Sequence, residues 1–108
     1  MKQERKYIID FTNVNHYLEM HAVIKHSLKF PDYYGCNLDA FWDCLTEMYG
    51  GQIYIKIIGI EVIERKFGDA AEKMIGILKE AKHDCEEDFP DSFKIEILRE
   101  DGTVTVVE

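Results

Sequence analysis

Three segments of the chain are rich in β-branched and aromatic residues, as β-strands are. They are residues 7–11, 53–58 and 93–98. The middle segment has hardly any polar alternation, which is typical of a strand that is covered on both faces. A shorter run of the same kind, residues 103–107, follows Asp101-Gly102. Because Asp-Gly between two β-prone runs favours a tight turn, we expect a hairpin at the end of the chain.

Between the first two strands, the apolar residues have the spacing of helices. Residues 15–29 carry apolar side chains at intervals of three and four, which predicts one buried helical face. The residues of that face are Leu18, Met20, Val23, Ile24 and Leu28. Pro31 ends this helix, and a second helix is predicted from Leu38 to about Glu47, with Asn37 as its amino-terminal cap. Its apolar stripe consists of Leu38, Phe41, Leu45 and Met48.

Two more helices are predicted before the last long strand. A short one covers residues 60–67, and a longer one extends from its cap, Asp69, to about Lys82. The apolar face of the longer helix consists of Ala71, Ile75, Leu78 and Ala81. The acidic stretch of residues 84–91, which contains a proline, is predicted to be a solvated loop.

The order of these elements predicts the fold class. Strand, helices, strand, helices, strand is typical of an α/β domain in which right-handed crossovers join three parallel strands. The terminal hairpin is expected to add an antiparallel edge strand. With 108 residues, of which 46% are hydrophobic, the chain can bury one core, so we expect a single domain over residues 1–108.

The charge of the chain narrows the range of partners. Its 13 Lys and Arg residues against 21 Asp and Glu residues give a formal net charge of −8. A chain with this charge repels nucleic acid and anionic membranes, so we expect it to bind neither of them. A basic partner is expected instead. No apolar run suits a membrane span or a signal peptide, which predicts a cytoplasmic protein.

Few residues have the pattern of a catalytic or metal site. The three cysteines, which lack CxxC spacing, are expected to be reduced thiols and are Cys36, Cys44 and Cys85. Three histidines recur every five residues and therefore spread around their helix, so we expect surface or cap positions for His16, His21 and His26. No nucleotide-binding, serine-hydrolase or zinc-protease motif is present, and no cofactor is predicted.

The most informative segment is residues 31–46, in which aromatic and acidic residues alternate with a helical stripe. The only tryptophan, Trp42, lies with Asp39 and Asp43 on the face opposite the apolar stripe. Two interpretations stay open: Trp42 anchors a binding patch, or it folds over the edge of the sheet. The helix dipole accounts for Asp39 but not for Asp43, and two carboxylates four residues apart repel each other unless a cation lies between them. Because neighbours on a convex helix do not flank a substrate, a catalytic acid pair is disfavoured.

The run P-D-Y-Y-G-x-N-L-D-A-x-W-D-C-L-T over residues 31–46 resembles the signature of the barstar family, intracellular inhibitors of secreted ribonucleases. A weaker likeness lies at residues 79–82, near the end of the last long helix. The resemblance implies a three-stranded parallel sheet with helices. It also implies that the loop and the following helix cover the active site of a barnase-like ribonuclease.

The resemblance further implies which residues contact the partner. Asp39 and Asp43 match positions that approach the phosphate-binding groups of the nuclease, and the second aspartate is the main anchor. Further contact positions in this loop and helix match Tyr33, Gly35, Asn37, Leu38 and Trp42. On the last long helix, the matching positions are Ile77 and Glu80.

The chain also departs from the family pattern. Cys36 replaces an acidic residue, Met48 replaces a tryptophan, and Gly50-Gly51 has the look of an insertion. Residues 84–91 and the final hairpin extend beyond the pattern. An alternative function is therefore an immunity or binding module for a different basic toxin or protein. A small enzyme or metal binder that uses the helix carboxylates is a third hypothesis.

Overall fold

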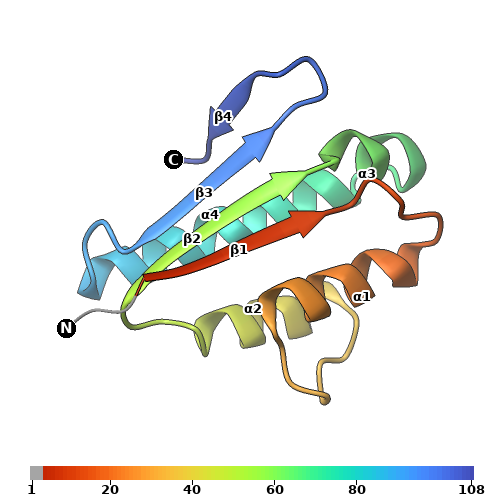
Figure 1. The fold of residues 1–108 in the computed structure, drawn as a ribbon. Helices are drawn as coiled ribbons and strands as arrows, with labels where there is room; N and C mark the ends of the chain where they lie inside the picture. Colours follow the sequence, from red (N-terminus) through yellow and green to blue (C-terminus); the bar gives the residue numbers. More distant parts are fainter. Residues whose placement is uncertain (1–3) are drawn as a thin grey trace.

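The computed structural model describes residues 4–108, and this part of the chain forms a sheet packed against helices (Figure 1). In chain order the elements are β1 (Glu4–Asp10), α1 (Tyr17–Leu28), α2 (Leu38–Thr46), β2 (Gln52–Ile58), α3 (Ile60–Lys66), α4 (Ala70–Asp88), β3 (Phe93–Leu98) and β4 (Val104–Val106). Residues 1–3 of the predicted domain lie outside the described residues.

The sheet has the strand order β1-β2-β3-β4. The first three strands are parallel, with Ile9 beside Ile57 and Ile57 beside Ile97. The last strand pairs antiparallel with β3, so that Ile97 lies opposite Thr105. This arrangement confirms the predicted α/β class, the three parallel strands and the antiparallel edge strand.

One face of the sheet carries most of the buried side chains, and the other is partly open to solvent. Along β2, the side chains that face the core alternate with half-buried ones, and the buried set is Ile53, Ile55 and Ile57. On the other face of the sheet, Ile8 is 59% exposed and Lys56 and Ile58 are half-buried. In Figure 1, α4 runs behind the strands. The prediction that both faces of β2 are covered was therefore wrong, because Tyr54, Lys56 and Ile58 extend the β-prone run along a face that is partly open to solvent.

The buried face of α1 differs in part from the predicted one. Met20, Ile24 and Leu28 are buried as expected, whereas Leu18 is 66% exposed. Leu18 and Met20 are two positions apart, which is about 200° around the helix axis, so the two side chains cannot share one face. On the buried face of α1, the residue next to Met20 is His21, which is fully buried.

The last helix is longer than predicted. α4 continues to Asp88, so the expected loop from Asp84 begins about one helical turn later. Cys85 is 1% exposed and extends the buried face by one turn beyond Ala81. Lys82 and Glu86, four residues apart, form an ion pair at 2.5 Å on the same segment. The acidic composition suggested a loop, but burial of one cysteine and this pair stabilise helix instead.

Candidate functional site

The loop before α2 is joined to the helix by the cap residue. The Oδ1 atom of Asn37 accepts a hydrogen bond from the backbone N–H of Ala40 at 2.8 Å, as an amino-terminal cap does. Its Nδ2 donates to the backbone oxygen of Gly35 at 3.2 Å. One side chain therefore determines where α2 begins and how the loop enters it.

A cleft lies between α2 and α4. It has a volume of about 420 Å³, and the residues that line it are Leu38, Asp39, Trp42, Asp43, Ile77 and Glu80. All six are among the nine residues predicted to bind a partner. Leu38, Trp42 and Ile77 are half-buried and pack against the core. The indole of Trp42 thus contacts the core and also lines the cleft, so each of the two earlier interpretations describes part of its position.

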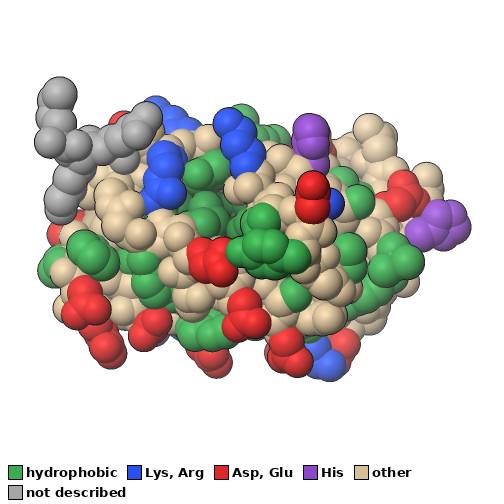
Figure 2. Space-filling model, turned by 90° about the horizontal axis from the view of Figure 1, so that it is seen from below, with side chains coloured by type: hydrophobic (Ala, Val, Ile, Leu, Met, Phe, Trp, Pro, Cys, Tyr) green, Lys and Arg blue, Asp and Glu red, His purple; other side chains and the backbone are tan. Residues whose placement is uncertain are grey.

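The carboxylates of the cleft are exposed. Among residues 4–108, no ion pair involves Asp39, Asp43 or Glu80. On the face shown in Figure 2, most acidic side chains lie along the lower margin and most basic ones near the upper margin. The cleft therefore combines an apolar floor with negative charges that are left available to a cation.

The three remaining predicted residues, Tyr33, Gly35 and Asn37, lie in the loop between α1 and α2. Tyr33 is 69% exposed, and its hydroxyl donates a hydrogen bond to Oε2 of Glu47 at 2.8 Å. This bond raises the pKa of the Tyr33 phenol, because the nearby carboxylate disfavours the phenolate. Glu47 was not among the predicted residues, although its position four residues after Asp43 places it on the same side of α2.

The base of the loop is attached to the core by a buried pair of side chains. The hydroxyl of Tyr34 and Nδ1 of His21 are 2.6 Å apart, and both residues are buried. Burial raises the pKa of the Tyr34 phenol and lowers the pKa of the His21 imidazole. The prediction of a surface or cap position was wrong for His21, because His21 lies three residues before Ile24 and seven before Leu28, on the buried side of α1. His16 caps α1 and His26 is exposed, as predicted.

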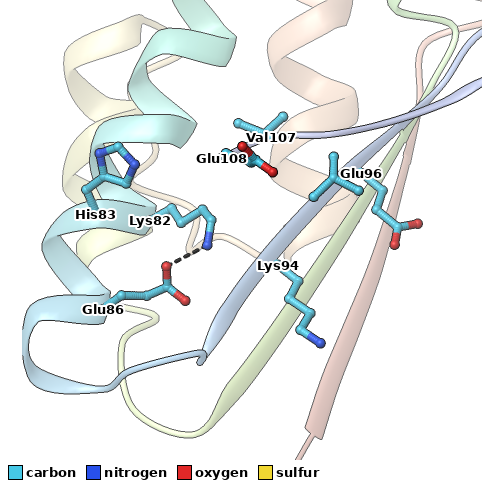
Figure 3. A pocket seen from close by; sticks show the side chains of 8 residues that line it. Lys82, His83, Glu86, Lys94, Glu96, Val107 and Glu108 are labelled. Carbon is cyan, nitrogen blue, oxygen red and sulfur yellow. Dashed lines mark hydrogen bonds and ion pairs between the residues drawn. The ribbon is translucent and has the colours of Figure 1, made fainter.

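A second pocket, of about 450 Å³, lies between α4 and the edge of the sheet formed by β3 and β4 (Figure 3). It is bordered by the last turns of α4, the start of β3 and residues 106–108. Lys82 is paired with Glu86 in this pocket, while Lys94 and Glu96 point away from that pair. The charged groups therefore do not converge on one point.

The thiols of residues 4–108 are unpaired, and the same residues form no metal site. Cys36, Cys44 and Cys85 are free cysteines. Burial raises the pKa of the Cys44 thiol, which makes it a poor nucleophile. Within residues 4–108, no three His, Cys, Asp or Glu side chains are grouped so that they could hold a metal ion. In the same part of the chain, no helix is both long and apolar enough to cross a membrane.

Taken together, the fold and the cleft define a small α/β domain with an acidic, partly aromatic surface formed by two helices and a loop. The family model described as Barstar (barnase inhibitor) matches residues 5–97, and the chain belongs to the barstar family. It is also similar to the protein named "Putative ribonuclease inhibitor YrdF" from Bacillus subtilis (strain 168). The two are 37% identical over 85 residues, which cover 79% of this chain and 93% of the relative. The predicted family is thus confirmed, and these findings indicate an inhibitor rather than an enzyme.

Proposed function

We propose that this protein inhibits a barnase-like ribonuclease by covering its active site with α2, the preceding loop and the adjoining face of α4. In this proposal Asp43 is the main anchor and Asp39 assists it. Both carboxylates take the place of substrate phosphates among the basic groups of the nuclease.

The observation that carries the proposal is the cleft between α2 and α4. Three carboxylates, those of Asp39, Asp43 and Glu80, border it without ion-pair partners among residues 4–108. A site built for phosphate offers arginine or lysine side chains that can form charge-assisted hydrogen bonds with such groups. The half-buried Trp42 at the same place supplies the aromatic area that binding hot spots commonly use.

The loop supports the same proposal. A Cβ atom built at Gly35 would meet Asn37 Nδ2 at 3.4 Å and Ala40 Cβ at 3.5 Å, which are ordinary contact distances. Packing within the chain therefore does not require glycine at this exposed position. The missing side chain leaves room for a partner to approach the backbone closely.

The test is an RNA-cleavage assay with purified barnase. Wild-type protein should inhibit it, whereas Asp43→Ala should raise the inhibition constant by at least about 30-fold, because truncating one partner of a buried charge pair costs about 2 kcal/mol or more. The matched control is Glu87→Ala, which removes an exposed carboxylate from α4 outside the cleft and should change inhibition by less than about twofold. The free energy of unfolding of each variant should lie within about 0.5 kcal/mol of the wild-type value.

Each outcome has a distinct meaning. No inhibition by wild-type protein would overturn the barnase-like target, and capture of another basic protein by the same surface would favour the alternative of an immunity module. Equal inhibition by wild type and Asp43→Ala would remove Asp43 as the anchor. A large loss of stability in Asp43→Ala would assign this residue a structural role.

A further inference from the structure

The hydrogen bond between Tyr33 and Glu47 joins the tip of the loop to the residue that follows the end of α2. The two residues are 14 positions apart in the sequence, and the donor–acceptor distance is 2.8 Å. Both residues are exposed, so burial of the ring does not explain the orientation of Tyr33. Glu47 is the only hydrogen-bond partner of this hydroxyl among residues 4–108.

This bond determines what the hydroxyl can offer to a partner. A phenol has one O–H donor and lone pairs that accept. Because the proton of Tyr33 is donated to Glu47, only the acceptor side of the oxygen and the face of the ring remain available. A cationic N–H group, such as a guanidinium, fits both, since it can donate to the oxygen or lie over the ring.

We infer that Glu47 is a positioning residue for partner binding: it holds Tyr33 in its binding orientation and restricts that position to partner groups that donate hydrogen bonds. The inference rests on the proposed function and goes beyond it, because the proposal does not use Glu47. Ordering a side chain before binding removes an entropy cost from association, and for one such side chain this corresponds to about three- to tenfold in affinity.

The chain contains a matched control for this interaction. The hydroxyl of Tyr54 on β2 donates a hydrogen bond to Oε2 of Glu96 on β3. This pair has the same two residue types, tyrosine and glutamate, and lies on the far face of the sheet. The hydrogen bond raises the pKa of the Tyr54 phenol as well. Glu96→Ala therefore removes the same charge and the same kind of bond at a place away from α2.

The first measurement uses the free protein and does not depend on any partner. The phenol of Tyr33 is titrated by NMR and assigned by its loss in Tyr33→Phe. Its titration midpoint should fall in Glu47→Ala, and it should not move in Glu96→Ala, which should lower the midpoint of Tyr54 instead. An unchanged Tyr33 midpoint in Glu47→Ala would overturn the inference at its first step.

The second measurement is the affinity for barnase. Glu47→Ala should weaken binding about three- to tenfold, chiefly through faster dissociation, and Glu96→Ala should have less than about a twofold effect. Glu47→Gln keeps an oxygen that accepts from Tyr33 and should recover most of the affinity. In a Tyr33→Phe background, Glu47→Ala should weaken binding by a further factor of less than about two, because no hydroxyl is left for Glu47 to hold.

These outcomes separate the inference from the proposed function. If wild-type protein binds barnase while Glu47→Ala binds equally well, the inference fails and the proposed function stands. If the effects of Tyr33→Phe and Glu47→Ala simply multiply, Glu47 acts as a charge only and the positioning role is wrong. If wild-type protein does not bind barnase, the proposed function fails, and the inference fails with it.

Discussion

The buried histidine beneath the loop between α1 and α2 should make the stability of this protein depend on pH. His21 is fully buried, and the rings of Tyr17 and Tyr34 lie at centroid distances of 5.1 and 5.8 Å from its ring. Its Nδ1 meets the Tyr34 hydroxyl, whereas its Nε2 is buried without a hydrogen-bond partner among residues 4–108. No ion pair involves His21 in that part of the chain. A proton on this ring would place an uncompensated charge in the core.

The direction and size of the effect follow from the lowered pKa of His21. In the unfolded chain this histidine titrates near 6.5, and burial lowers its pKa in the folded protein. Between those two values the unfolded state binds a proton that the folded state does not bind. The free energy of unfolding should therefore fall as the pH drops below about 6.5, by up to about 1.4 kcal/mol per pH unit, and this contribution should be constant at higher pH.

The assay is urea unfolding at several pH values between about 7.5 and 5.5, a range that lies above the titration of most carboxylates. His21→Gln keeps a polar neutral side chain beside Tyr34 and should remove the His21 part of the slope. If this variant does not fold, NMR titration of the wild-type imidazole gives the same answer, with an expected midpoint below 6.5. Equal slopes in wild type and variant, or a midpoint at or above 6.5, would refute the reasoning. A confirmed slope would mean that protonation of His21, whose ring meets the hydroxyl of Tyr34, destabilises the fold.

Two further predictions concern the cap and the tryptophan. Asn37→Ala should lower the free energy of unfolding by about 1 kcal/mol in urea titrations, because Ala40 loses its side-chain acceptor, and an unchanged midpoint would contradict the capping role. Trp42, half-buried in the cleft, should be partly quenched by acrylamide in the free protein and markedly less when a nuclease is bound. Equal quenching in both states would place the indole outside the interface.

Much of the fold was predictable because strands and helices have different periods of burial. The parallel strands 53–58 and 93–98 and the Asp-Gly hairpin after them combine local propensity with a clear turn signal, and both appear in the structure. The predictions that were wrong concern features that depend on contacts between residues distant in the sequence. The length of α4 follows from burial of Cys85, and the half-covered face of β2 follows from where all the helices pack.

The candidate site was predictable to a different degree in its two halves. Helical spacing alone placed Asp39, Trp42 and Asp43 together, and the structure lines one cleft with them. Ile77 and Glu80 were predicted from the family resemblance only, because the local sequence does not indicate which face of α4 packs against α2. The hydrogen bond that Tyr33 donates to Glu47 was missed because the two residues are 14 positions apart, and periodicity carries no information about such a contact.

The row of acids on α2 has a cost in the free protein that a basic partner would remove. Asp39 and Asp43 are one helical turn apart, and like charges at this spacing destabilise a helix by about 0.2–0.5 kcal/mol. The cap at Asn37 and the favourable position of Asp39 near the amino terminus offset this cost, so α2 forms before any partner arrives. A cation placed between the two carboxylates would turn the repulsion into attraction at no cost in helix ordering. In the proposed function, the same spacing that weakens α2 slightly on its own would therefore favour binding to a positively charged site.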